Sequence, residues 1–337
     1  MRRVAQLACL LALSSCGGSD GGSQSGVPVV SGPSPTPIPS PTPAPTPAPT
    51  PAAYLTYAQL TGDQSFKTAC AAVRPDYSPP LPVPVVSFGS GLTLGYTAAT
   101  QTYLLTPDPR DTGLFGTQAR SYGPADRDAT APANVTVFTR TSNGFVERLA
   151  IGSNAAAGGS PNYVRGFSLR VPLFGAQTVN PPAALYSCIF GVPTRLDDLP
   201  TSSPVYLRGG LNGTATNYPS GAPEAYVITQ SQVSFSADFA AGKVTTTIRM
   251  VGALATASGT SSTTVDLGTY TGIGTIDRAG SFSGQLASPD RIIRDATFAG
   301  SFFGPQATEV AYSIGLNSLD QTTGRNIVFI GNALALK

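Results

Sequence analysis

Eight short segments between residues 205 and 334 alternate apolar with polar residues, and this repetition constrains the fold more than any other feature. A period of two is typical of β-strands that bury one face, because successive side chains of a strand point to opposite sides of the sheet. Turn-forming residues such as those at 277–280 and 322–325 separate the segments. The predicted strands are residues 205–213, 226–239, 243–252, 263–276, 281–287, 296–303, 309–316 and 327–334.

Eight antiparallel strands joined by tight turns can close on themselves, which removes exposed sheet edges. The sequence therefore predicts an eight-stranded antiparallel β-barrel over residues 201–337. At this strand number the interior is either filled by side chains or holds one small ligand. Phe and Leu at inward positions favour a filled interior, and a hollow barrel is the alternative.

The stretch from Ala296 to Leu316 is the clearest hairpin of this region. Gly304 and Pro305 set its turn, because Pro fixes φ near −65° and Gly tolerates backbone angles that other residues avoid. Both arms alternate with a period of two, so each arm has two different faces.

This hairpin resembles the closing segment of the barrel in transferrin-binding protein B-like surface lipoproteins, which has the form Phe-x-Gly-x-Phe-Phe/Tyr-Gly-Pro-x-Ala-x-Glu-Val-Gly-Gly. The chain departs from that form at Ala311 and Tyr312, where the family usually has two glycines. Residues 191–201 resemble the junction between the family's handle sheet and barrel, and residues 91–106 resemble its first handle hairpin. The matching barrel residues are Phe298, Gly300, Phe302, Phe303, Gly304, Pro305, Ala307, Glu309 and Val310.

The resemblance implies an all-β chain, with a handle-like β-sheet region at 53–200 followed by the barrel at 201–337. It also implies a binding protein that captures a macromolecule or nutrient, such as an iron or haem source. The implied partners are a TonB-dependent transporter and a surface-lipoprotein translocator. Contact residues in such scaffolds lie on loops, so the loops at 107–133 and 214–225, the latter with Tyr218, are the candidate ligand-binding segments.

Residues 1–15 have the form of a lipoprotein signal peptide. Arg2 and Arg3 precede an apolar run that is too short to span a bilayer and ends at the lipobox Leu-Ser-Ser-Cys16. Cys16 is the predicted lipid anchor, carrying acyl chains such as palmitate, and each buried CH₂ contributes about 0.8 kcal/mol to membrane binding. Gly17 after this Cys favours the outer membrane, so we expect a lipid anchor in that membrane, and the resemblance implies exposure on the cell surface. The alternative is a plain secretory signal with an incidental Cys.

The lipidated Cys and a linker fill residues 16–52. Gly and Ser dominate residues 17–32, and Pro stands at every second position from Pro33 to Pro51. Polyproline II rises about 3.1 Å per residue, so the Pro-rich part predicts a disordered stalk that extends the protein by roughly 60 Å. A docking motif for a proline-binding domain is the alternative.

Loss of residues 1–15 would leave 18 basic and 18 acidic residues. A neutral chain argues against nucleic acid as a partner, because nucleic-acid binding needs a basic stripe.

Cys70 and Cys188 are the two cysteines left once Cys9 is removed and Cys16 is lipidated. An oxidising compartment favours a disulfide between them, and a loop of this length would contribute about 4 to 5 kcal/mol in the chain-entropy model. Two separate buried thiols are the alternative. No metal site is expected, because the chain has no His and no third Cys to complete a ligand set.

The region at 53–200 contains the best helix candidate, residues 61–73, with Phe66, Cys70 and Val73 on one face and Pro75 as the stop. Short β-like runs follow at 83–88, 91–96, 101–106, 135–140, 145–151, 163–173 and 185–192.

Catalytic patterns do not appear in the sequence. Without His there is no Ser-His-Asp or Cys-His arrangement, and none of the three lysines stands in a Ser-x-x-Lys spacing. We therefore expect a binding protein without a cofactor and not an enzyme. The alternative function is a periplasm-facing structural or carrier lipoprotein for a small apolar molecule.

Overall fold

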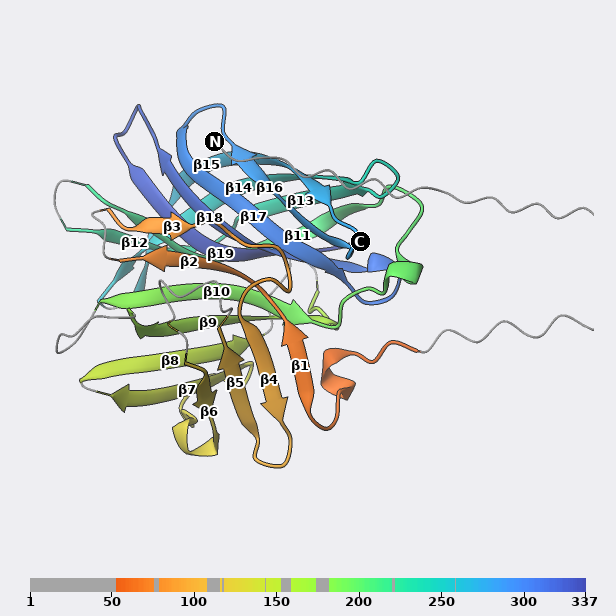
Figure 1. The fold of residues 1–337 in the computed structure, drawn as a ribbon. Helices are drawn as coiled ribbons and strands as arrows, with labels where there is room; N and C mark the ends of the chain where they lie inside the picture. The colour runs from red at the N-terminus through yellow and green to blue at the C-terminus, as the bar shows by residue number, and fades with distance from the viewer. Residues whose placement is uncertain are drawn as a thin grey trace, which may run out of the picture. The chain divides into compact units, whose positions relative to one another are not determined.

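A computed structural model describes residues 53–75, 79–107, 116, 118–142, 144–152, 159–173, 182–219, 222–257 and 259–337 (Figure 1). Cys16, the signal peptide and the Pro-rich linker lie outside these residues. Within the described part the chain is all-β, with short 3₁₀ turns at η1 (Tyr57–Gln59), η2 (Pro124–Asp126), η3 (Leu196–Asp198) and η4 (Pro305–Ala307). Residues Ala52–Lys337 form one compact unit.

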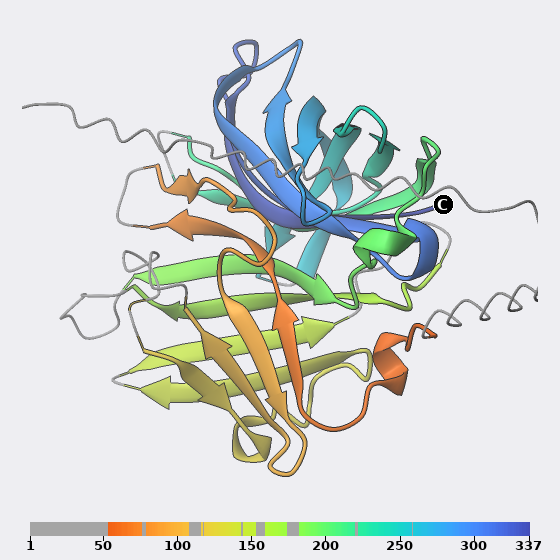
Figure 2. The same cartoon turned by 45° about the vertical axis from the view of Figure 1, so that its right-hand side comes forward.

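Two antiparallel sheets face each other in the N-terminal region, which we call the handle (Figure 2). Sheet A has the order β1-β4-β5-β6, and sheet B has the order β3-β2-β10-β9-β8-β7. Phe66, Leu94, Leu105, Phe167 and Phe190 belong to the apolar core of this region. The bounds are β1 (Gln64–Lys67), β2 (Ala69–Arg74), β3 (Leu81–Val83), β4 (Thr93–Thr97), β5 (Thr102–Thr106), β6 (Arg120–Tyr122), β7 (Val135–Ser142), β8 (Phe145–Gly152), β9 (Val164–Pro172) and β10 (Ala183–Gly191).

A buried cluster of charges links the two handle sheets at their edges. The Glu147 side chain on β8 is only 3% exposed and lies 2.5 Å from the Arg120 guanidinium on β6 and 2.7 Å from that of Arg140 on β7. Tyr122 donates a hydrogen bond to the same carboxylate, and Arg140 stacks over the Tyr122 ring. A buried carboxylate needs such partners, because an unpaired charge in a core is costly.

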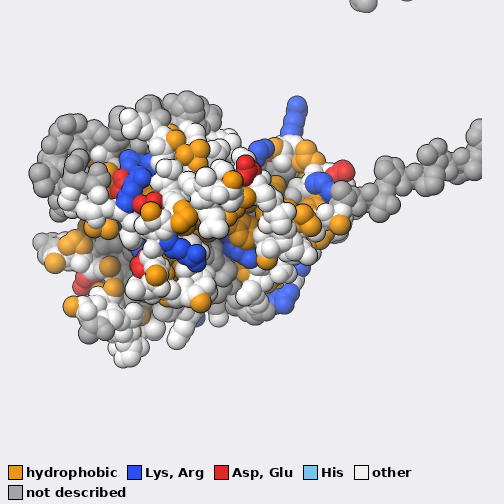
Figure 3. Space-filling model, turned by 90° about the horizontal axis from the view of Figure 1, so that it is seen from below, with side chains coloured by type: hydrophobic (Ala, Val, Ile, Leu, Met, Phe, Trp, Pro, Cys, Tyr) orange, Lys and Arg blue, Asp and Glu red, His pale blue; other side chains and the backbone are white. Residues whose placement is uncertain are grey.

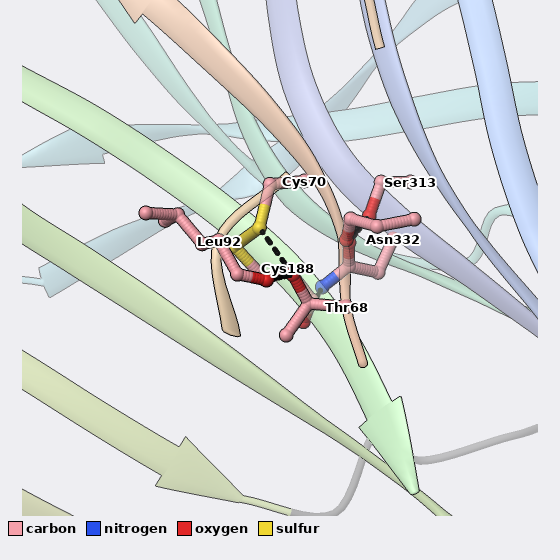
Figure 4. The surroundings of a disulfide bond; sticks show 7 residues. Thr68, Cys70, Leu92, Cys188, Ser313 and Asn332 are labelled. Carbon is pink, nitrogen blue, oxygen red and sulfur yellow. Dashed lines mark hydrogen bonds between the residues drawn. A yellow bond between two sulfur atoms is a disulfide. The ribbon is translucent and has the colours of Figure 1, made fainter. Parts of the chain in front are cut away.

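The disulfide between Cys70 and Cys188 is formed, as the cysteine count favoured. The two residues stand directly opposite each other on the neighbouring strands β2 and β10. Figure 4 shows Leu92 on one side of the bridge, with Ser313 and Asn332 of the barrel on the other. The bridge therefore connects residues 118 positions apart at the point where the handle meets the barrel.

The predicted helix at 61–73 is wrong. Residues Gln64–Lys67 and Ala69–Arg74 form strands β1 and β2 of different sheets, separated at Thr68. The buried Thr68 hydroxyl donates to the backbone carbonyl of Leu92, which fixes the bend. Both faces of β2 are covered, so its apolar run carries no strand-like alternation.

The barrel is built from the last nine strands, which occupy eight positions of a closed ring. β12 and β13 share one position, since both pair with β11 and with β14. The ring closes by pairing β11 with β19 over ten residue pairs. The bounds are β11 (Val205–Asn217), β12 (Glu224–Ile228), β13 (Gln232–Asp238), β14 (Lys243–Thr256), β15 (Gly259–Ile276), β16 (Ser281–Ala287), β17 (Ile292–Phe303), β18 (Glu309–Leu319) and β19 (Asn326–Leu336).

Aromatic rings fill the barrel interior. Tyr312 is fully buried, and its ring centroid lies 5.4 Å from Phe235, 5.6 Å from Phe298 and 6.0 Å from Phe282. Gly300 stands directly opposite Tyr312, where a Cβ would come within 2.5 Å of the Tyr312 Cβ. The departure from the family's glycine pair thus places a ring over an inward glycine, and the Tyr312 hydroxyl bonds to Thr246 at 2.5 Å.

The outer wall of β17–β19 packs against sheet B. Ala69, Ala71 and Val73 of β2 point at this wall, whereas Cys70 and Ala72 point into the handle core. Ser313 donates to the Ala69 carbonyl at 2.7 Å, and Asn332 donates to the Cys188 carbonyl at 3.0 Å. Strand β2 therefore lies between the handle core and the outer wall of the barrel.

Candidate functional site

The first described residues are fixed at one end of the barrel, which we call the near end. The Tyr57 backbone N–H donates to the Asn162 carbonyl at 2.8 Å, and the Arg195 N–H donates to the Tyr54 hydroxyl at 2.7 Å. The Arg195 guanidinium also stacks 4.4 Å over the Tyr54 ring. The near end includes the barrel turns at 239–242, 277–280 and 304–308, and it lies on the right in Figure 1.

Glu309 joins the closing hairpin to the handle at the near end. Its carboxylate is buried and accepts hydrogen bonds from the backbone N–H groups of Asn162, Tyr163 and Val164 at 2.6, 3.0 and 3.1 Å. Burial raises the pKa of Glu309, and the three N–H donors oppose that rise. Glu309 therefore has a structural role, joining the handle to the barrel, and does not face a ligand.

The other residues of the predicted barrel motif also have structural positions. Phe298 and Phe302 point into the barrel core, while Phe303 points outward and meets Phe88 edge to face at 5.6 Å. Gly304 adopts a φ of 71°, which favours glycine, ahead of Pro305. None of these side chains offers a ligand an open surface, since Phe298, Phe302 and Phe303 are almost fully buried.

We call the opposite end of the barrel the far end. The strands that end there are joined by the connections at 218–223, 257–258, 288–291 and 320–325. A polar cluster lies there, at the ends of β11 and β12. The Glu224 carboxylate accepts from Asn217 Nδ2 at 3.0 Å and from the Tyr226 hydroxyl at 2.8 Å. These bonds, with the positive charge of Arg325, lower the pKa of Glu224, whereas burial and the Glu224 charge raise that of Tyr226.

A buried arginine supports the far-end connections. The Arg291 side chain is 4% exposed, and its Nη2 lies 3.4 Å from Asp320 Oδ2. Its Nε and Nη1 have no hydrogen-bond partner within the described part of the chain. Gly268, with a φ of 114°, makes room for it, because a Cβ there would lie 2.2 Å from Nε. Nearby, burial raises the pKa of Tyr270 to about 12.

The two loops predicted to contact a ligand differ in their positions. Residues 108–115 and 117 of the loop at 107–133 lie outside the described residues, and the rest of the loop contains strand β6 and the turn η2. In the loop at 214–225, Tyr218 is half-buried and packs beside Val328 and Ile330 on the wall facing the handle. Tyr218 therefore does not line the far-end cluster.

Charged side chains are sparse on the face that Figure 3 shows, and Lys and Arg lie beside Asp and Glu there rather than in one patch. Among the described residues, no group of three or more His, Cys, Asp or Glu could hold a metal ion. No helix in the described part is long and apolar enough to cross a membrane. The chemistry available at the far end is hydrogen bonding and paired charges of both signs.

Three features of the structure could not be found from the sequence. The acceptor role of Glu309, the buried Arg291 and a pocket beside the disulfide all depend on contacts between distant strands. The one available signal was the position of Glu309 in the family motif, which gives no partner.

Comparison with known proteins gives a sequence match in the barrel. The family model described as "C-lobe and N-lobe beta barrels of Tf-binding protein B" matches residues 201–332, less than half of the chain. A comparison with curated proteins found no match.

Solved structures of the same kind are related more loosely. A mutant of transferrin binding protein B from Haemophilus parasuis Hp5 is 14% identical, with a TM-score of 0.37 over 73% of this chain and 54% of that one. A double mutant of that protein is 12% identical, with a TM-score of 0.37 over 82% of this chain and 77% of that one. The N-lobe of lactoferrin binding protein B from Moraxella bovis is 14% identical, with a TM-score of 0.28 over 55% of this chain and 80% of that one.

The chain thus spans about half the length of the first of these structures. At such TM-scores the structures add no argument, and the assignment depends on the sequence match and on the barrel motif. Residues 201–332 of this chain are therefore similar to the C-lobe and N-lobe β-barrels of transferrin-binding protein B.

Proposed function

We propose that this protein is a lipid-anchored outer-membrane protein that holds a macromolecular ligand at the far end of its barrel, on the cell surface. The observation that carries the proposal is the attachment of Tyr54 and Tyr57 at the near end. A stalk from Cys16 would reach the folded region there, so the far-end loops would be the part of the barrel that faces away from the membrane.

The far end suits a protein ligand. Its connections contain acidic and basic residues, among them Glu224, Asp320 and Arg325. Loops held by a rigid scaffold are the usual place for binding residues, because they vary without disturbing the core. Mixed charge favours a partner with a complementary mixed surface over a polyanion such as nucleic acid.

The family match suggests the first ligands to test. Its description names the barrels of a Tf-binding protein, so an iron-carrying extracellular protein, such as transferrin or lactoferrin, is the ligand class that we propose. A TonB-dependent transporter would then receive the iron, and a surface-lipoprotein translocator would deliver this protein to the surface. The role is binding and not catalysis.

The test compares two epitope-tag insertions in the full-length chain on intact cells. One tag enters the far-end turn at Thr322, and the control enters the near-end turn at Arg278. We expect protease to cut the chain on intact cells while a periplasmic protein survives. We also expect labelled transferrin or lactoferrin to bind, and the far-end tag alone to block this binding.

Different failures of this experiment contradict different parts of the proposal. If the chain resists protease until the outer membrane is permeabilised, and the released chain is protease-sensitive, surface display is wrong. If the near-end tag blocks binding and the far-end tag does not, the far-end site is wrong. If neither protein binds to cells on which the chain is exposed, an iron carrier of these two kinds is not the ligand.

The alternative role, a carrier that uses the barrel as its container, has less support. Phe235, Phe282, Phe298, Phe302 and Tyr312 occupy the barrel interior. A small-molecule ligand would need a different cavity.

A further inference from the structure

A cavity of about 590 Å³ lies beside the disulfide, between sheet B, the segment at 84–92 and barrel strand β16. Small-molecule sites in proteins usually have volumes of about 300 to 1,000 Å³. The cavity is therefore large enough for a ligand of two or three fused or linked rings, or for a short acyl chain.

The cavity exists because its walls carry small side chains and because the segment at 84–92 is held on the barrel wall. Ala72 of β2 and Ser283 of β16 contribute little volume, and a Cβ at Gly91 would press on Val86 at 3.0 Å. Phe88, the largest side chain of the segment at 84–92, does not line the cavity, because it packs against Phe303 of the barrel wall. The Val85 N–H donates to the Thr297 hydroxyl at 2.9 Å, which holds the segment on the barrel.

The lining selects an uncharged ligand. Cys70, Ala72, Val83 and Leu92 supply apolar surface, and Ser87 and Tyr186 supply hydroxyl groups. None of the described residues that line the cavity carries a charge. A charged ligand would lose its hydration there without gaining a counter-ion, which is unfavourable.

We propose that this pocket binds a small, uncharged and largely apolar molecule, which the hydroxyl groups of its wall orient. The site lies between the handle and barrel strand β16 and is separate from the far-end loops, so this inference does not depend on the proposed function.

The experiment titrates the full-length chain with N-phenyl-1-naphthylamine, a neutral two-ring dye that fluoresces in apolar surroundings. Its sulfonated relative 1-anilinonaphthalene-8-sulfonate is the charged comparison. The pocket is filled by Ala72→Phe, and the matched control is Ala241→Phe, which adds the same ring to an exposed turn at the near end. All chains are purified in the same detergent, so dye in micelles contributes equally.

We expect saturable binding of one neutral dye per wild-type chain and weaker binding of the sulfonated dye. Ala72→Phe should weaken the neutral dye by roughly tenfold or more, because the ring takes up the space of the ligand. Ala241→Phe should bind like wild type. A non-reducing gel and a melting curve check that each variant keeps its disulfide and its fold.

If Ala72→Phe does not fold, Ser87→Phe replaces it in the test. Ser87 lines the cavity, is half-buried and lies outside any strand, so the Phe ring at this position fills the cavity without altering a strand. If a folded variant with a filled pocket binds the neutral dye as tightly as wild type does, the proposed site is wrong. Equal affinity for the two dyes overturns the preference for uncharged ligands.

Discussion

The handle and the barrel lie side by side in one chain but are stabilised by different means. The barrel closes its hydrogen-bond ladder through β11 and β19 and fills its interior with neutral aromatic rings. The handle consists of two sheets that do not close, and it adds a disulfide and a buried charge cluster around Glu147. A closed sheet has no exposed edge strands, whereas the handle sheets have edges. The disulfide joins neighbouring strands of sheet B, and the Glu147 cluster joins the edges of the two sheets. The following predictions test that distinction.

The largest effect should come from removing the disulfide. We expect the double variant Cys70→Ala and Cys188→Ala to lower the free energy of unfolding by about 4 kcal/mol, because the bridge closes a loop of more than a hundred residues. Denaturant unfolding measures this loss. Hydrogen exchange should rise mainly in β8 and β9, and an equal rise in β14 and β15 would show that the barrel depends on the bridge as well.

Removing a ring from the barrel core should have a slightly smaller effect. We expect Tyr312→Ala to cost about 3 to 4 kcal/mol, since it leaves a cavity among Phe235, Phe282 and Phe298. Tyr312→Phe is the control and should cost about 1 kcal/mol, the value of its bond to Thr246. If Tyr312→Ala lost no more than Tyr312→Phe in denaturant unfolding, the interior would not be tightly filled.

The next effect in size should come from removing Glu309, which joins the handle to the barrel. Glu309→Ala leaves the N–H groups of Asn162, Tyr163 and Val164 without their acceptor. We expect a loss of about 2 to 3 kcal/mol, because each buried donor without a partner costs about 1 kcal/mol or more. Glu224→Ala, at the far end, is the control and should lose less than about 1 kcal/mol. A biphasic melt in Glu309→Ala alone would show that this residue couples the handle to the barrel.

The smallest effect concerns pH. Burial raises the pKa of Glu309 above its ordinary value of 4.5, so the folded chain binds that proton more tightly than the unfolded chain does. This contribution to stability is complete below pH 4.5 and declines as the pH rises through the raised pKa. We expect stability to fall more steeply with rising pH in wild type than in Glu309→Gln over that window. Parallel pH curves for the two chains would contradict the raised pKa.

Most of the barrel could be predicted from the sequence, because most of its strands bury one face and expose the other, at least in part. Strands β18 and β19 are exceptions, since the handle covers their outer face. Strand β16 has the predicted bounds, and β17, β18 and β19 extend the predicted strands by a few residues. One interruption was missed: the predicted strand 226–239 divides into β12 and β13 at Gln230, whose φ is 46°. A positive φ at a residue other than Gly or Asn has no clear sequence signal.

The handle could be predicted less well, for physical reasons. Strand β2 packs against the handle core on one face and the barrel on the other, so it shows no alternation and its spacing also fits a helix. The segment at 83–88 was predicted as a strand, yet only Leu81–Val83 pairs, because Val85 and Phe88 are held by the barrel wall. Such contacts between distant residues leave no periodic pattern in the sequence.

The candidate site could be predicted only in outline. The loops that end at Glu224 and Arg325 are recognisable as turns, but their meeting at one end of the barrel follows from the closure of the ring. The pocket beside Cys70 depends on what Val85 and Phe88 contact. No local pattern in the sequence predicts such a cavity.

The position of β2 between the handle core and the outer wall of the barrel also sets an order of assembly. This strand is among the first to be synthesised, yet it pairs with β10 and packs on β17, β18 and β19, which are made last. A chain that is made, or passes through a pore, from its N-terminus can form the handle core from residues before 191, but the barrel-facing side of β2 stays uncovered until the last strands are available. Contacts of such high sequence separation slow folding. The barrel-facing side of β2 should thus remain accessible to chaperones for as long as the C-terminus is missing, and a truncation before β19 should leave the barrel open and part of this side uncovered.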